Sequence, residues 1–364
     1  MINSRLNKIV PLIARVVDGQ NISAKESEEA FTQIFLHDTA GYHYATFVAA
    51  IHAKGETADE LLGLCLASKK LGNQIKLNTP INKIIDLSGT GGGSLKTVNV
   101  STTASFIVAA ASYAVPKESF YGITSPTGSA DLFAAFGIDI AKLTAVKIKK
   151  TLEKVRICAT YAPFISPKLK ARGLLFKKAF IENGLKIRTP FHLVSNLSSS
   201  VEMTHRIYGC YSEKYLEILG ELLTKLGYKR FLTFCGFPGI PEISNIGKTT
   251  VVEQDGKKPR KYILTPKDLG VRKSKLEEIK TGGKEQNIID FLRILQGKER
   301  GPKADLAAIN AAAAFYVLGE SKSIAGSVPK ALKIIKGGKA FKVLERLVKE
   351  VGDPKLLKLW LARS

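Results

Sequence analysis

A glycine-rich turn between an apolar run and a Ser/Thr-rich segment is the part of this chain best suited to chemistry. The stretch IIDLSGTGGGSLKTVNVSTTASF occupies residues 84–106. Its glycines allow backbone N–H groups to approach an anion closely. The helix expected to follow the turn adds the positive end of its dipole. We therefore predict a phosphate-binding turn formed by Gly89, Thr90, Gly91 and Gly92, with Asn99, Ser101 and Thr102 at the start of the helix.

The elements around this turn are predicted from apolar spacing. Residues 3–75 show helical periodicity, and Thr57 followed by Glu60 is a capping box that starts a helix. From residue 82 onward, short apolar runs alternate with helical segments, a pattern that favours a parallel sheet covered by helices. At 364 residues the chain is also long enough for two domains. The fold class is α/β, with a small N-terminal α-helical domain and a larger α/β domain that has a central, mainly parallel sheet.

Composition excludes some protein classes and leaves one question open. The chain contains no run of about 18 apolar residues, so we expect no membrane span. The N-terminus lacks a signal-peptide core, so we expect a cytoplasmic protein. The four cysteines are widely separated, which predicts buried thiols rather than disulfides or a zinc site. The net charge is +23, from 55 Lys and Arg against 32 Asp and Glu. Such an excess indicates either a solvated lysine-rich surface or a surface that binds nucleic acid.

Beyond the turn, a series of segments in order along the chain resembles the anthranilate phosphoribosyltransferase family. The string GTGG followed by TVNVST is similar to the family's loop for phosphoribosyl diphosphate. The segments AIHAKGETADELLG, SPTGSADLFAAFGI, YAPFISPKLK, IRTPFHLVSNL, GIPEIS, YILTPKDLG and NAAAAFYVLG match further landmarks. The resemblance covers nearly the whole chain. It implies a helical domain of residues 1–80 joined by a returning segment near 167–196, an α/β domain of residues 81–166 and 197–364, and a homodimer formed through the helical part.

The resemblance also implies roles for individual residues. The family transfers ribose 5-phosphate from phosphoribosyl diphosphate to an aromatic amine and uses Mg²⁺. By position, Lys117 would grip the diphosphate as a catalytic residue, and Ser129 would bind the substrate. Ser101 and Glu242 would be the metal ligands. Ser129 is equally explained as part of a helix N-terminus.

Several positions depart from the family's pattern on the phosphate side. Gly93 stands where the family usually has Asp, and Pro241 replaces the Asp that precedes Glu242. A proline side chain cannot ligate a metal, so one Mg²⁺ ion rather than two is expected. After Lys117 the family has His-Gly-Asn-Arg, whereas this chain has Glu118, Ser119, Phe120 and Tyr121. A carboxylate at position 118 would repel diphosphate if it pointed toward it.

The acceptor side departs further. A histidine of the family becomes Ser166, and the family's FNLLGPLTNP becomes FHLVSNLSSS at residues 191–200. The arginine pair that meets the acceptor carboxylate falls where this chain has about six extra residues, so Lys177 and Lys178, or Arg172, could replace it. His192 is an isolated histidine that we expect to be structural. The sequence thus predicts a divergent phosphoribosyltransferase whose acceptor is unknown, with an aromatic amine as one candidate. The alternative is a non-catalytic relative that binds nucleic acid through basic segments such as residues 257–261 and 272–275.

Overall fold

Helices precede the first strand, as the apolar periodicity predicts. The computed structural model of the chain describes residues 4–93, 95–121, 128–185, 187–256 and 258–364. Thr57 and Glu60 form the predicted capping box, in which each side chain accepts a hydrogen bond from the other residue's backbone N–H. The helices of this region are α1 (Ser4–Asn7), α2 (Val10–Val17), α3 (Ala24–His37), α4 (Tyr42–Lys54) and α5 (Ala58–Leu71).

The central sheet has the strand order β1-β4-β5-β6-β7. Its first three strands are parallel, and β6 and β7 join in antiparallel pairing. A second, two-stranded parallel sheet pairs β2 with β3. The strands are β1 (Ile85–Gly89), β2 (Val115–Glu118), β3 (Ile157–Thr160), β4 (His205–Gly209), β5 (Arg230–Gly236), β6 (Thr249–Asp255) and β7 (Arg260–Leu264). The predicted mainly parallel α/β architecture is therefore present.

Strand β4 is one of the elements that sequence reasoning missed. Its sequence, HRIYG, contains a histidine and an arginine and does not read as a buried strand, yet all its residues are buried. Arg206 is fully buried because it pairs with Asp86, its register partner on β1, at 3.0 Å. The ion pair across two strands offsets the cost of burying the charge, and a reading of one strand alone cannot reveal this.

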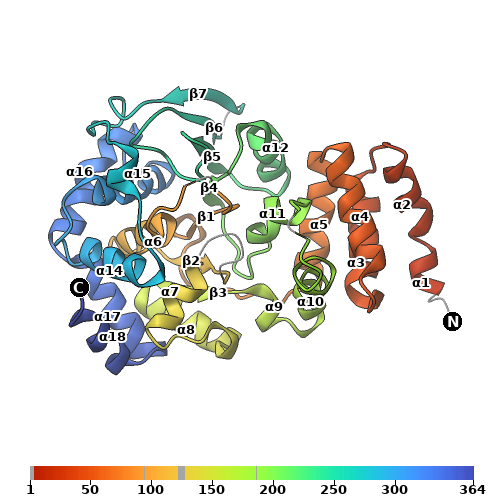
Figure 1. The fold of residues 1–364 in the computed structure, drawn as a ribbon, viewed down its shortest axis with the longest axis horizontal. Helices are drawn as coiled ribbons and strands as arrows, with labels where there is room; N and C mark the ends of the chain where they lie inside the picture. Colours follow the sequence, from red (N-terminus) through yellow and green to blue (C-terminus); the bar gives the residue numbers. More distant parts are fainter. Residues whose placement is uncertain (1–3, 94, 122–127, 186, 257) are drawn as a thin grey trace.

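Helices cover the sheet and complete the larger part of the molecule (Figure 1). Helix α15 is buried along nearly its whole length and packs on α6, α16 and the sheet. The helices are α6 (Val100–Ala110), α7 (Ser129–Ala135), α8 (Ala145–Val155), α12 (Leu216–Lys225), α13 (Leu276–Ile279), α14 (Lys284–Leu295), α15 (Pro302–Val317), α16 (Ile324–Lys336), α17 (Lys339–Val351) and α18 (Pro354–Leu361). Short 3₁₀ turns are η1 (Ile81–Lys83), η2 (Ile140–Lys142) and η6 (Glu213–Tyr215).

The segment after β3 returns to the N-terminal helices. Its elements contact α3, α4 and α5, and Figure 1 shows them between those helices and the sheet. They are α9 (Ala162–Ile165), η3 (Pro167–Leu169), α10 (Lys170–Phe176), the π-helical turn η4 (Lys177–Ile181), α11 (Pro190–Val194) and η5 (Ser195–Leu197). The packing agrees with the returning segment that the resemblance implies, while the domain boundaries themselves remain predictions.

The surface and the cysteines bear on two further predictions. All four cysteines are buried and free, as predicted. Within the described ranges, no helix is long and apolar enough to cross a membrane.

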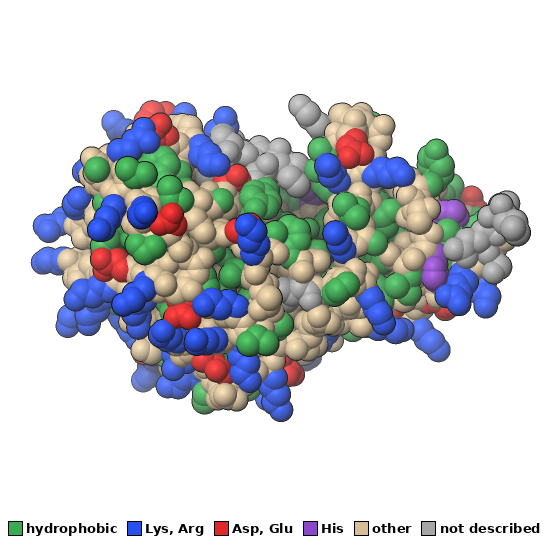
Figure 2. Space-filling view, turned by 90° about the horizontal axis from the view of Figure 1, so that it is seen from below, with side chains coloured by type: hydrophobic (Ala, Val, Ile, Leu, Met, Phe, Trp, Pro, Cys, Tyr) green, Lys and Arg blue, Asp and Glu red, His purple; other side chains and the backbone are tan. Residues whose placement is uncertain are grey.

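Figure 2 shows Lys and Arg side chains spread over one whole face, with acidic and hydrophobic side chains among them. Part of this charge is paired, since Glu350 accepts from Lys147 and Lys154.

Candidate active site

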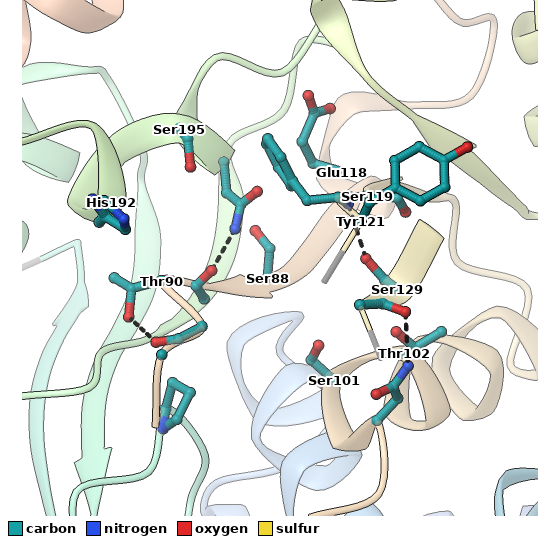
Figure 3. A pocket seen from close by; sticks show the side chains of 18 of the residues that line it. Ser88, Thr90, Ser101, Thr102, Glu118, Ser119, Tyr121, Ser129, His192 and Ser195 are labelled. Atoms are coloured by element: carbon teal, nitrogen blue, oxygen red, sulfur yellow. Dashed lines mark hydrogen bonds between the residues drawn. The ribbon is translucent and has the colours of Figure 1, made fainter. Parts of the chain in front are cut away.

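One cavity of about 880 Å³ lies where β1, β2 and the start of α6 meet the returning segment. Figure 3 shows Ser101 and Thr102 on one side of it, and His192 and Ser195 on the other. The sequence-predicted site residues, although spread over the chain, all line this cavity: Gly89, Thr90, Gly91, Gly92, Asn99, Ser101, Thr102, Lys117, Ser129 and Glu242. The structure therefore brings together every residue that was predicted to bind phosphoribosyl diphosphate or metal. Of the predicted landmark SPTGSAD, residues 125–127 lie outside the described residues.

The glycine turn has the backbone that its sequence predicts. Gly91 and Gly92 adopt φ values of 63° and 70°, in the left-handed region that favours glycine. Gly89 is required for a different reason, because a Cβ there would lie 2.7 Å from the carbonyl oxygen of Gly209. Thr90 N–H donates to that same oxygen at 2.8 Å. The turn is thus packed against the end of β4.

Asn99 is the N-cap residue of α6 and is held by a residue far along the chain. Asn287, on α14, accepts from Asn99 N–H at 3.2 Å and donates to Asn99 Oδ1 at 3.3 Å. Asn287 also lines the cavity, as do Lys96 and Thr97. Sequence reasoning did not single out these three residues. For Lys96 and Thr97 the signal was their place between the glycines and the helix, whereas nothing local marks Asn287.

Lys117 extends from β2 toward the start of α6. Its Nζ donates to the carbonyl of Leu87 at 2.7 Å and to Ser101 Oγ at 3.1 Å. Burial lowers the pKa of Lys117 to about 8, and nearby carboxylates, Asp86 first among them, oppose that shift. An anionic ligand would favour the charged ammonium further. Lys117 therefore has a suitable position to bind a phosphate, and a bound phosphate would keep its ammonium group charged.

Ser101 and Glu242 are the two predicted metal ligands. Ser101 Oγ contacts Lys117, and Glu242 is close enough to affect the pKa of the same lysine. Burial raises the pKa of Glu242 to about 8, with Lys117 opposing. Among the described residues, no group of three or more His, Cys, Asp and Glu side chains could hold a metal ion. One carboxylate and one hydroxyl still fit Mg²⁺, which usually keeps waters and substrate phosphates as its other ligands.

The two departures beside Glu242 are linked in space. A Cβ on Gly93 would lie 2.7 Å from Cδ of Pro241. The Asp that the family carries at position 93 therefore conflicts sterically with the proline that replaces the family's other Asp. The chain thus lacks both of the carboxylates that the family carries at positions 93 and 241.

Glu118 points away from Lys117, as successive residues of a strand do. Its Oε2 accepts from Thr160 Oγ1 on β3 at 2.8 Å, and the side chain is buried at the cavity wall. Lys117 bonds on the side of α6 instead. The Glu118 carboxylate is thus not directed at the atoms that Lys117 contacts, although it lies in the wall of the same cavity and its charge acts on Lys117.

Aromatic rings line the cavity on the side of the returning segment. Tyr161 packs edge-on against Phe120 and Phe164, with centroids 5.0 and 4.5 Å apart. Phe176 and Phe191 stack at 5.4 Å, and all five rings contribute to the wall. The cavity is thus polar on the side of α6 and aromatic on the other side.

The residues that could replace the family's acceptor-binding arginines lie in different places in the structure. Lys177 lines the cavity, together with Lys170. Lys178 instead donates to the carbonyl of Thr39 at 3.0 Å. Arg172 is fully buried behind the wall, 5.1 Å from the Phe191 ring centroid, and its nitrogens have no hydrogen-bond partner in the described part of the chain.

Ser166, which replaces a histidine of the family, and the isolated His192 also lie in different places. Ser166 is buried and accepts from Asn73 N–H, a structural role outside the cavity wall. His192 lines the wall, and its Nδ1 accepts from Thr189 N–H at 3.1 Å at the start of α11. Burial lowers the pKa of His192.

Models of known families match most of the chain. The glycosyl transferase family, helical bundle domain, matches residues 10–72, and the glycosyl transferase family, a/b domain, matches residues 81–341. An anthranilate phosphoribosyltransferase of Methanosarcina mazei is 36% identical over 92% of this chain and 87% of its own length. The chain belongs to the anthranilate phosphoribosyltransferase family. It is thereby an enzyme of the glycosyltransferase class, and the comparisons do not favour the alternative of a non-catalytic nucleic-acid-binding protein.

Other members and solved structures agree with this placement. The anthranilate phosphoribosyltransferase of Petrotoga mobilis is 32% identical over 92% of this chain and 95% of its own length. The crystal structure of the Thermus thermophilus enzyme has a TM-score of 0.83 and 28% identity, covering 93% of this chain and 98% of that one. The Saccharomyces cerevisiae enzyme, solved with phosphoribosyl diphosphate and Mg, has a TM-score of 0.82 at 21% identity, covers 95% of this chain and 98% of that one, and supports the fold.

Proposed function

We propose that the protein transfers ribose 5-phosphate from phosphoribosyl diphosphate to the amino group of an aromatic amine and releases diphosphate. One observation carries this proposal: a glycine turn suited to phosphate and a wall of aromatic rings face the same cavity. A single pocket of this size can hold both reactants next to each other. Positioning two reactants in this way is a large part of the catalytic advantage for a substitution reaction.

The phosphate side would bind the donor through backbone and side-chain groups. The N–H groups of the glycine turn and the N-terminus of α6 supply partial positive charge. Lys117 supplies a full charge next to Ser101. In the reaction the C1–oxygen bond to diphosphate breaks while the amine nitrogen bonds to C1 and then releases a proton to water, so negative charge develops on the leaving group. Lys117 is placed to stabilise that charge.

Ser101 and Glu242 would hold Mg²⁺, and the bound ion would neutralise charge on the diphosphate. The yeast relative, whose structure contains phosphoribosyl diphosphate and Mg, supports use of this metal in the family. With one protein carboxylate in place of the family's larger set, we expect one tightly held ion. The oxygen ligands that the protein lacks would come from the substrate and from water.

The acceptor side would orient a planar ring between the two groups of aromatic side chains. Such packing favours aromatic over aliphatic amines. Lys170 and Lys177 at the wall favour an acceptor that also carries an acidic group. Anthranilate, which the related enzymes are named for, has both properties and is the first acceptor to test.

The test is turnover of purified protein with phosphoribosyl diphosphate, Mg²⁺ and anthranilate, followed by the loss of anthranilate and the release of diphosphate. Aniline and 2-aminobenzamide, which lack the carboxylate, would show whether the acidic group matters. Diphosphate release that depends on an aromatic amine supports the proposal. No binding of phosphoribosyl diphosphate at millimolar concentration would overturn it. Salt-sensitive binding of single-stranded DNA without any turnover would instead support the alternative.

Dimerisation through the helical part remains a prediction that accompanies this function. Apolar side chains are exposed on the N-terminal helices, among them Val17 on α2 (60%) and Tyr42 on α4 (77%). A homodimer interface would cover such residues. The mass measured by light scattering should be twice that of the chain, and Tyr42→Lys should reduce it if this face is the interface.

A further inference from the structure

The side-chain amide of Asn99 can be turned in two ways that offer opposite chemistry to a ligand. Its nitrogen donates hydrogen bonds, whereas its oxygen only accepts them. Asn99 lines the cavity at the start of α6, on the side where the phosphates of the donor substrate are proposed to bind. An anionic ligand gains from an N–H group there and is repelled by a carbonyl oxygen. The group that faces the cavity therefore affects the affinity for phosphoribosyl diphosphate.

We propose that Asn287 is a positioning residue that fixes the orientation of the Asn99 amide, so that its nitrogen rather than its oxygen is offered to phosphoribosyl diphosphate. This inference rests on the proposed function, because it concerns the binding of the same donor substrate. Asn287 is buried and belongs to α14, 188 residues along the chain from the residue that it orients.

The hydrogen bonds between the two residues allow one arrangement only. The main-chain N–H of Asn99 can only donate, so its partner at 3.2 Å is the side-chain oxygen of Asn287. The nitrogen of Asn287 is then the atom that meets the Asn99 side chain at 3.3 Å, and the atom it meets is the Asn99 oxygen. The Asn99 nitrogen is left on the other side, where it donates to Gly128 O at 3.3 Å. Among the described residues it has no second acceptor, which leaves one N–H group for a ligand.

Packing between α14 and α6 keeps the two asparagines opposite each other. Phe291, one turn further along α14, packs edge-on against Phe106 of α6 with ring centroids 5.5 Å apart, and both rings are buried. The segments that precede the two helices are joined as well, since Thr281 N–H donates to Lys96 O at 3.1 Å. Contacts before and after the pair thus hold it in place. A side chain that is already fixed loses little further freedom when a ligand binds.

Asn287 also lines the cavity, and a direct contact with the substrate is the competing explanation for any effect of its loss. The two explanations differ in what happens when the Asn99 side chain is absent. A residue that acts through Asn99 has no further effect on binding once that side chain is removed, whereas a direct contact contributes equally in both backgrounds. The test is therefore a double-mutant cycle.

The first experiment measures the Kd for phosphoribosyl diphosphate with Mg²⁺ by calorimetric titration. Asn287→Asp keeps the acceptor for the Asn99 N–H but replaces the donor by a second oxygen, so the Asn99 amide turns its nitrogen toward position 287 and its oxygen toward the ligand. We expect Kd to rise about tenfold or more, since a hydrogen bond to a charged ligand is lost. Asn287→Ala leaves both orientations open and should have a smaller effect. In the Asn99→Ala background, Asn287→Asp should change Kd by no more than about twofold.

Gln286→Glu is the matched control, because it makes the same change from amide to acid at the neighbouring position of α14. Gln286 donates to Asp290 and not to Asn99, so the Kd of this variant should stay close to that of the wild type. An equal rise of Kd in the control would attribute the effect to added charge and would overturn the proposal. A wild-type Kd in Asn287→Asp, or an undiminished effect in the Asn99→Ala background, would also overturn it.

A second measurement needs no ligand. Neutron diffraction on crystals exchanged into deuterium oxide distinguishes the nitrogen of an amide, with its two deuterium atoms, from the oxygen. We expect the Asn99 nitrogen on the side of Gly128 in the wild type and on the side of position 287 in Asn287→Asp. The reverse orientation in the wild type would contradict the proposal. If the wild-type protein does not bind phosphoribosyl diphosphate, the proposed function is refuted together with the role in binding, while the neutron map still decides whether Asn287 orients Asn99.

Discussion

Gly93→Asp tests the steric link between the two departures at the metal side. The substitution restores the acid that the family usually carries there. The backbone at Gly93 does not have positive φ, so an Asp is not excluded by its conformation. Its Cβ, however, would lie 2.7 Å from Cδ of Pro241 and 3.4 Å from Cα of Ile240. A carbon–carbon approach below 3.0 Å forces the neighbouring loop to move.

Overpacking of this kind typically costs about 1–3 kcal/mol. We expect Gly93→Asp to lower the free energy of unfolding by about that amount, measured by urea denaturation. Pro241→Ala removes Cδ and thus the contact that causes the clash. In the Pro241→Ala background, Gly93→Asp should therefore cost at least about 1 kcal/mol less than in the wild-type background.

The double-mutant cycle separates steric conflict from other effects of a new carboxylate. Gly93→Ala supplies the Cβ without charge and should show the same coupling with Pro241→Ala. If Gly93→Asp costs the same in both backgrounds, the reasoning from the Pro241 contact is wrong. A clash relieved in the double mutant would also give a protein whose Mg²⁺ affinity can be compared with the wild type, with an added carboxylate near Glu242.

Other predictions concern single side chains. Lys117→Met should reduce kcat/KM for phosphoribosyl diphosphate by about 10²-fold or more, because it removes the buried charge beside Ser101; turnover within threefold of wild type would exclude that role. Arg206→Met should destabilise the fold by about 3–5 kcal/mol, because Asp86 is left buried without its partner, and Asp86→Asn in the same chain should recover part of the loss in urea denaturation. The Ser23 N–H and Arg15 lower the pKa of Glu26 to about 2, well below its ordinary value. The stability it contributes is complete above about pH 4.5 and is lost as the pH falls toward 2. Glu26→Gln should therefore flatten this part of the stability curve, and an identical acid limb in both proteins would contradict the assignment.

The sequence predicted the parts of the site that depend on local chemistry. Glycines in a row, an asparagine and hydroxyls at a helix start, and the capping box of α5 have their effect within a few residues. These features are present in the structure, as are the four buried thiols. The ordered landmarks then predicted Lys117 and Glu242, and both line the cavity with the turn. Their binding roles await the experiments above.

Tertiary structure alone decided which side chains contact one another at the site and which substitutions are linked. Asn287 lies 188 residues along the chain from Asn99, the residue that it contacts. Strand β4 was missed because its buried arginine is neutralised by a carboxylate on another strand. Hydrogen bonds, ion pairs and steric contacts act over a few ångströms in space, whereas sequence patterns report only on neighbours along the chain. The steric conflict between an acid at position 93 and Pro241 becomes visible only when the two loops are folded against each other.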